Sequence, residues 1–133
     1  MNDAESYWSP LCKLVSELRC WVRVAWREGS STKEGDWGQM LIIPTTGYLE
    51  GPSGPMPFRD VEWVEVSTSR IKGGIAGRPL QFVDVKGEIL AALGGTKLLW
   101  ELRDSRWFME RVFKDEPVLV ARVVNPFGPT PRL

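Results

Sequence analysis

Two stretches of the chain have the hydrophobic spacing of amphipathic helices. In the first, apolar residues recur at the i, i+3, i+4 and i+7 positions that one helix face presents, namely Leu11, Leu14, Val15 and Leu18. Ser9 followed by Pro10 is typical of an N-cap with proline at the first helical position, so we expect a helix over residues 10–19. In the second, Asp84 is suited to cap a helix over residues 84–93 that ends at consecutive glycines.

Four other stretches have the residue pattern of strands, in which apolar and polar residues alternate or apolar residues follow one another. Residues 20–27 alternate between two faces, and residues 37–43 form a more apolar run that ends at Pro44. Residues 58–66 and 118–124 complete the set. Within 58–66, Val61 and Trp63 share a face with Glu65, and Glu62 lies on the other face. Because neither face is wholly apolar, this stretch is expected to be an edge strand.

The connecting segments are polar or rich in helix and strand breakers. Residues 28–35 indicate a turn, and residues 45–57 contain three Gly and three Pro, which favours an exposed loop. Residues 67–79 indicate a basic, glycine-rich loop. Residues 97–102 and 106–113 fit two strands joined at 103–105 or one longer helix, and their alternation favours strands.

These elements predict an α+β fold in which two helices pack on a mostly antiparallel sheet of five or six strands. With 133 residues, the chain suits a single domain, which we assign to residues 1–124. Residues 125–133, rich in proline, are expected to form an irregular tail. The polar, acidic start of the chain does not resemble a secretory signal, and no apolar run reaches the length of a membrane span. A cytoplasmic protein with no membrane partner is therefore expected.

The charge of the chain is balanced overall but unevenly distributed. Residues 34–65 carry six of the seventeen acids against one base, Arg59, so the rest of the chain holds eleven acids against sixteen bases. The acidic stretch also contains four aromatic residues: Trp37, Tyr48, Phe58 and Trp63. An acidic surface with exposed rings suits the binding of a basic protein partner. A net charge of zero does not favour binding to nucleic acid.

The residue types present restrict the possible chemistry. The chain has no histidine, the most frequent general base and metal ligand, and its two cysteines, Cys12 and Cys20, are expected to be free thiols. We therefore predict no metal site, no cofactor, no catalytic residues and no enzymatic activity. A carboxylate enzyme that uses Asp60 and Glu62 on one strand face is the least favoured hypothesis.

Two sequence segments resemble those of small bacterial immunity-type proteins, which neutralise toxins. They are Gly-Tyr-Leu-Glu-Gly-Pro at 47–52 and Pro-Phe-Arg-Asp-Val-Glu-Trp-Val-Glu-Val at 57–66. The resemblance implies a cytoplasmic, non-enzymatic antitoxin that binds a cognate protein toxin and occludes its active site. On this hypothesis the partner has a basic surface, and this chain is a monomer or a weak homodimer.

The residues expected to contact the toxin are the exposed acids and rings of the central stretch. They are Tyr48, Glu50, Asp60, Glu62, Trp63 and Glu65. The alternative is a small-ligand or nucleotide-binding domain that uses the basic loop around Arg70, Lys72 and Arg78. Its glycines do not have the spacing of a nucleotide-binding motif.

Overall fold

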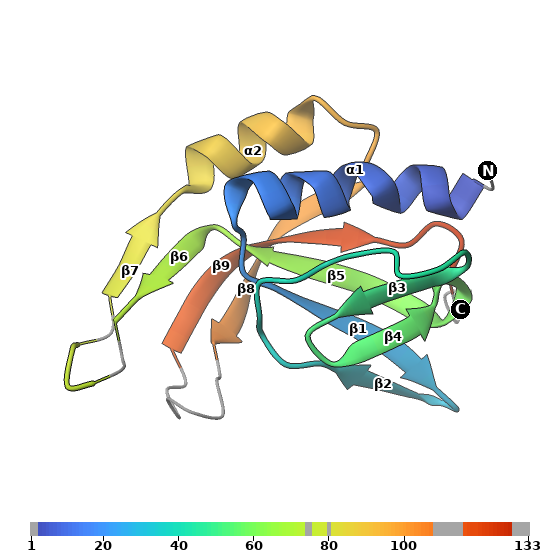
Figure 1. Ribbon diagram of the computed structural model, residues 1–133, viewed down its shortest axis with the longest axis horizontal. Helices are drawn as coiled ribbons and strands as arrows, with labels where there is room; N and C mark the ends of the chain where they lie inside the picture. The colour runs from blue at the N-terminus through green and yellow to red at the C-terminus, as the bar shows by residue number, and fades with distance from the viewer. Residues whose placement is uncertain (1–2, 74–75, 80, 108–115, 129–133) are drawn as a thin grey trace.

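The chain folds as two helices on a curled antiparallel sheet, in a computed structural model that describes residues 3–73, 76–79, 81–107 and 116–128 (Figure 1). The elements in chain order are α1 (Asp3–Leu18), β1 (Val22–Glu28), β2 (Ser31–Glu34), β3 (Tyr48–Gly51), β4 (Gly54–Pro57), the 3-10 helix η1 (Phe58–Asp60), β5 (Val61–Ser67), β6 (Ser69–Lys72), β7 (Gln81–Asp84), α2 (Lys86–Gly94), β8 (Trp100–Trp107) and β9 (Glu116–Val124). The main sheet has the order β2-β1-β5-β9-β8, and β3-β4 and β6-β7 are separate hairpins. The expected α+β class is confirmed.

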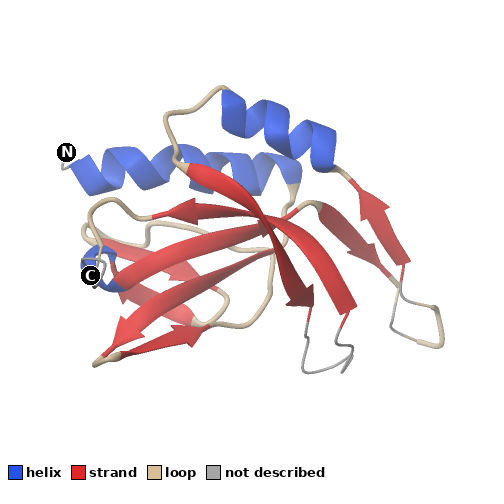
Figure 2. Cartoon of the chain, turned by 180° about the vertical axis from the view of Figure 1, so that it is seen from behind, coloured by secondary structure: helices blue, strands red, loops and turns tan. Residues whose placement is uncertain are grey.

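Both helices and the β3-β4 hairpin cover one face of the main sheet. The main core lies between these layers, with Trp8, Leu11 and Val15 from α1 and Ile89 and Leu93 from α2. The sheet contributes alternate residues of its three central strands, namely Val22, Val24, Val64, Val66, Ala121 and Val123. Figure 2 shows the opposite side of the sheet, over which no helix of the described residues lies. Neither helix in that part of the chain has the length and apolar character to span a bilayer.

Helix α1 begins at Asp3, seven residues before the predicted start, and Pro10 lies inside it. The prediction was wrong because Trp8 is fully buried and belongs to the same apolar face as Leu11 and Val15. Proline lacks the N–H that would bond to the preceding turn, but the packing of Trp8 outweighs that loss.

The segments expected to be polar turns contain strands. The predicted 28–35 turn holds β2, which pairs with β1 across a tight turn at Gly29, where φ is +62°. The predicted exposed loop 45–57 holds the β3-β4 hairpin, whose Leu49 is completely buried. The predicted strand 37–43, in contrast, makes only isolated bridges at Gly38 and Ile42. Burial of Leu49 therefore overrides the turn-forming composition of residues 45–57, whereas β2 is exposed along its whole length and forms through its pairing with β1.

Strand β5 lies in the centre of the sheet and not at its edge, as the sequence suggested. It pairs with β1 on one side and with β9 on the other. The edge prediction rested on charged residues on both of its faces, and it was wrong because the charges on β5 have partners on neighbouring strands. An ion-paired carboxylate can occupy a central strand that an unpaired one could not.

The second half of the chain follows the predictions more closely. Helix α2 forms and ends at Gly94, but its N-cap is Val85 and not the predicted Asp84. Asp84 is the last residue of β7, and its Oδ1 accepts a hydrogen bond from Lys86 N at 2.9 Å. The predicted loop 67–79 begins as strand β6, which pairs with β7. Strand β8 is continuous where a break at 103–105 or a helix was considered, and β9 forms as expected. The predictions for residues 108–113 and 129–133 lie outside the described residues.

Gly51 gives a test of the packing between β3 and β1. A Cβ atom on Gly51 would lie 2.6 Å from Cγ2 of Val24, a side chain whose rotamer is restricted. We expect Gly51→Ala to lower the free energy of unfolding by about 1–3 kcal/mol, measured by urea denaturation.

The matched control is Gly87→Ala in α2. Apart from its chain neighbours and the backbone of its own helix, no atom lies within 4 Å of the position that a Cβ on Gly87 would occupy, so alanine should raise the free energy of unfolding by about 0.5–1 kcal/mol. Equal effects of the two substitutions would contradict the proposed close approach of β3 to β1.

Candidate functional site

The most polar cluster in the interior is centred on Glu65, on the sheet face that the helices do not cover. The strand register places Arg23 of β1, Glu65 of β5 and Arg122 of β9 side by side across the sheet. Ser105 of β8 also reaches the cluster. The Glu65 side chain is 0% exposed, so these neighbours, and not bulk water, must stabilise its carboxylate.

Both carboxylate oxygens of Glu65 are occupied. Oε1 accepts hydrogen bonds from Arg23 Nε at 2.8 Å and from Ser105 Oγ at 3.0 Å. Oε2 accepts hydrogen bonds from Arg122 Nε at 3.0 Å and Nη2 at 2.8 Å. Arg23 Nη2 also donates to Ser105 Oγ at 2.8 Å and lies 3.3 Å from Glu34 Oε2. This arrangement neutralises the carboxylate and leaves it no free oxygen for chemistry.

Tryptophan rings enclose the two arginines. The Trp63 ring has the Arg122 guanidinium carbon 4.1 Å from its centroid and that of Arg23 at 5.5 Å. Arg23 also lies 5.2 Å from the centroid of Trp37, which stacks on Trp107 at 4.6 Å. These cation–π contacts add to the ion pairs and shield them from water. With 8% exposure, Trp63 is an internal residue.

Five of the six predicted toxin contacts, Glu50 included, are at least partly buried, and Tyr48 is the exception. Trp63 and Glu65 are buried in this cluster. Glu62 is partly buried and has Arg27 Nη2 2.5 Å from its Oε1, while Thr32 Oγ1 donates to its Oε2 at 2.8 Å. Asp60 is partly buried at the end of η1. The expectation that these acids form one exposed acidic surface is not met.

Tyr48 and Glu50 lie elsewhere, on the outer side of the β3-β4 hairpin. An antiparallel bridge between Ile42 and Glu50 places the extended segment around Ile42 beside β3, on the side opposite β4. Ile42 and Tyr48 are 44% and 41% exposed, and Met40 is exposed as well. We call this surface, formed by Met40, Ile42, Tyr48, Glu50 and Pro55, the hairpin face.

Two hollows border the hairpin face. One, of about 380 Å³, lies between the end of α1 and the segment 39–42 and includes Arg19 and Ile42 in its walls. The other, of about 340 Å³, includes Tyr48, Arg59 and Phe127. Among the described residues, neither Arg19 nor Arg59 has an ion-pair partner. The hairpin face thus combines exposed apolar side chains, one carboxylate and two nearby cations.

Sequence reasoning did not assign Met40 and Ile42 to a site. The pattern that could have indicated them is alternation: Met40 and Ile42 are exposed, whereas Leu41 is buried and Ile43 packs against the core. Alternation predicted a strand for this segment but could not show that its outer face remains uncovered.

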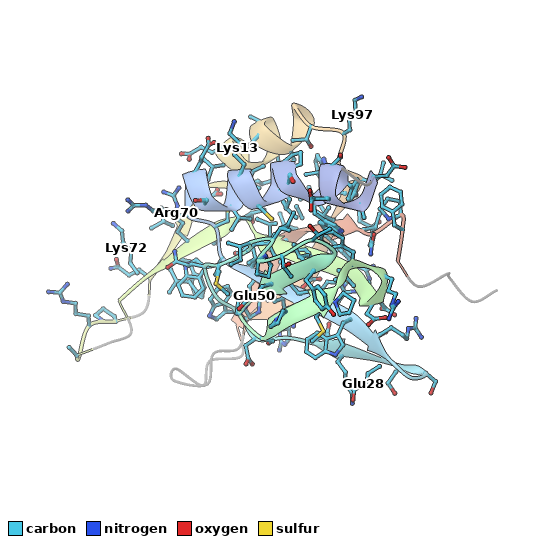
Figure 3. All side chains as sticks on the ribbon, turned by 45° about the vertical axis from the view of Figure 1, so that its right-hand side comes forward. Lys13, Glu28, Glu50, Arg70, Lys72 and Lys97 are labelled. Carbon is cyan, nitrogen blue, oxygen red and sulfur yellow. The ribbon has the colours of Figure 1, made fainter. Side chains whose placement is uncertain are left out.

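The residues of the alternative ligand site do not converge. Arg70 turns toward the end of α1, where its Nε and Nη2 donate to the carbonyl oxygen of Leu18, the Nε at 3.1 Å. Lys72 lies farther out along the β6-β7 hairpin (Figure 3). Arg78, in the segment between β6 and β7, is exposed. A cation at the C-terminus of a helix stabilises the helix dipole, so Arg70 already has a structural role.

The cysteines are free, as expected, and their thiols are shielded. Burial raises the pKa of the Cys12 thiol to about 12, and burial is also the main reason that the pKa of Cys20 rises to about 11. Among the described residues, no group of three His, Cys, Asp or Glu side chains is placed to hold a metal ion.

Comparison of the chain with models of protein families, with curated proteins and with solved structures gave no match.

Removal of the Glu65 charge tests the central cluster. Glu65→Gln should lower the free energy of unfolding by about 3–5 kcal/mol, because the partly buried guanidinium groups of Arg23 and Arg122 lose the charge of the carboxylate that they share. Glu101→Gln is the control. Glu101 pairs with Arg122 from the other side of β9, as Glu65 does from β5, but its side chain is 58% exposed. Glu101→Gln should change the free energy by less than about 0.5 kcal/mol in the same urea titration. A small effect of Glu65→Gln would show that the cluster does not stabilise the sheet.

The raised thiol pKa values predict slow reaction with Ellman's reagent at pH 8 in the folded protein and fast reaction of both thiols in denaturant. The unfolded chain loses these protons near the ordinary cysteine value of 9.0, and the folded chain keeps them to about 11 or 12. The two thiols should therefore make the free energy of unfolding fall as the pH rises above about 9. Replacement of both cysteines by alanine should remove that part of the decrease.

Proposed function

We propose that this chain is a non-enzymatic binding protein of the bacterial immunity type, which acts in the cytoplasm and occludes a protein toxin through its hairpin face. The observation that carries the proposal is the group of exposed apolar side chains at Met40, Ile42 and Tyr48. They surround a carboxylate, Glu50, on a layer whose inner side is fully packed.

The hairpin face has the composition of a docking surface. An exposed tyrosine beside a hollow can act as an anchor, because its ring buries a large apolar area while the hydroxyl finds a polar partner. Leu49 and Met56 pack the inner side of the hairpin against the core, so the outer side chains are held on a fixed backbone. A rigid surface loses little conformational entropy on binding.

Fewer charges are available to attract a toxin than the sequence suggested. Glu62 and Glu65 are neutralised by arginines of neighbouring strands, so they contribute little field at the surface. Glu50 remains as the carboxylate beside the exposed apolar group, where it would attract a cationic residue of the toxin. Its effect should be mainly on the rate of association.

The test uses the product of the gene next to this one, expressed in a bacterium whose growth that product arrests. Co-expression of this chain should restore growth, and the two purified proteins should form a tight 1:1 complex by calorimetry. Failure to restore growth together with the absence of a complex would overturn the proposal.

Substitutions then locate the surface. Tyr48→Ala should weaken the complex by about tenfold or more, and Glu50→Lys should slow association and alter its salt dependence, as measured by stopped flow. Glu28→Lys is the matched control, because Glu28 lies at the tip of the β1-β2 hairpin, away from Glu50 (Figure 3). Equal effects at Glu28 and Glu50 would remove the hairpin face from consideration.

A further inference from the structure

Strand β8 forms one edge of the main sheet. It pairs with β9 from Trp100 to Trp107, and no strand of the described residues pairs with its other side. The hydrogen bond from Val124 N to Leu99 O, at 2.9 Å, shows that the backbone groups of Leu99 point toward β9, and those of Glu101 and Arg103 therefore do so as well. Because antiparallel pairs alternate, Leu102 and its neighbours two positions away direct their N–H and C=O groups to the open edge.

The side chains along this edge are exposed but contain both charges and apolar groups. Leu102 is 41% exposed. Glu101 and Arg103, on the opposite sheet face, have side chains that are 58% and 47% exposed and lie 3.3 Å apart as an ion pair. A long open edge is prone to pairing with another strand, and charged side chains along the edge commonly oppose such pairing. The charges of β8 alternate in sign, so an antiparallel copy can place opposite charges face to face instead of like charges.

We propose that β8 pairs antiparallel with β8 of a second copy of this chain, with the two-fold axis at Leu102. A two-fold axis that relates antiparallel strands runs perpendicular to the sheet, so facing residues must lie on the same sheet face. The axis must then lie midway between the two copies of one residue, which face each other across it, and not between two residues that are adjacent in the sequence.

Charge complementarity selects the position of the axis. An axis at Glu101, Arg103 or Asp104 would place two like charges directly opposite each other, which is unfavourable. An axis at Leu102 places Leu102 against its own copy and Glu101 against Arg103 of the other copy, twice. It also brings the outward N–H and C=O groups of the two Leu102 residues together as a hydrogen-bonded pair.

The far end of β8 limits the length of the pairing. Trp37 Nε1 donates to the carbonyl oxygen of Arg106 at 3.2 Å, so that acceptor is already engaged. The pairing therefore involves residues 100–104 of each chain. It uses a surface different from the hairpin face and leaves the hairpin face free for a toxin.

The experiment is sedimentation velocity of the purified full chain from the low micromolar to the millimolar range. The wild-type chain should dimerise in a concentration-dependent manner. Glu101→Arg and Arg103→Glu should each weaken dimerisation by about tenfold or more, because each places like charges opposite each other at two positions. Circular dichroism and thermal melting would verify that each variant is folded.

Two further samples make the test specific. An equimolar mixture of the Glu101→Arg and Arg103→Glu chains should dimerise, because each chain then presents the charge that the other lacks. The double variant Glu101→Arg/Arg103→Glu should dimerise by itself, since the swap restores the pairing. A wild-type chain that stays monomeric, or single variants that dimerise as well as the mixture, would overturn the proposal.

Discussion

The structure depends on one buried carboxylate. Glu65 lies in the central strand with no exposure to water, and an isolated charge in that position would cost several kcal/mol. Arg23, Arg122 and Ser105 offset that cost, and they come from β1, β9 and β8. Four of the five strands of the sheet must therefore be in register before the charge is satisfied, which makes the cluster a strong selector of strand order.

The same cluster bridges strands that the curl of the sheet brings together. Arg23 contacts Ser105 at 2.8 Å although β5 and β9 lie between their strands in the sheet order. The edge strand β8 can approach β1 in this way only if the sheet curves around the face that carries Glu65. Figure 2 shows β8 crossing in front of the other strands, as a strongly twisted sheet requires. Tryptophan rings fill this curved side in place of a helix.

This division of the sheet into a polar, tryptophan-lined side and a helix-covered side explains why the acidic stretch does not form one surface. Trp63 and Glu65 lie on the first side, while Tyr48 and Glu50 lie on the hairpin that covers the second. Of the surfaces that the described residues leave exposed, we propose the hairpin face, with its exposed apolar group, for a different protein and the edge of β8 for a copy of the same chain.

The sequence was most informative where local signals agree with packing. The alternation of β1 and β9 and the glycines that end α2 were sufficient to place these elements, although the N-cap of α2 is Val85 and not Asp84. Prediction failed at α1, where the burial of Trp8 extends the helix past Pro10. It also failed at β3 and β4, because turn-forming glycines at Gly47 and Gly54 look the same in a hairpin as in a loop. For the site, it found Tyr48 and Glu50 but not Ile42, whose exposure depends on what packs beside it.

By itself the sequence determined the class of the fold and the absence of histidine chemistry, because these follow from composition and from hydrophobic periodicity. It placed the residues of β5 only in part: Trp63 and Glu65 share a face as predicted, but Val61 packs in the core with Val64 and Val66, because the pairing of β1 with β5 shifts register beside it. Only the tertiary structure decided which charges are internal. Glu65 and Glu50 have the same side chain in the same acidic stretch, yet arginines more than forty residues away in the chain enclose one and not the other. Such long-range pairing depends on strand order, and local sequence patterns carry no information about strand order.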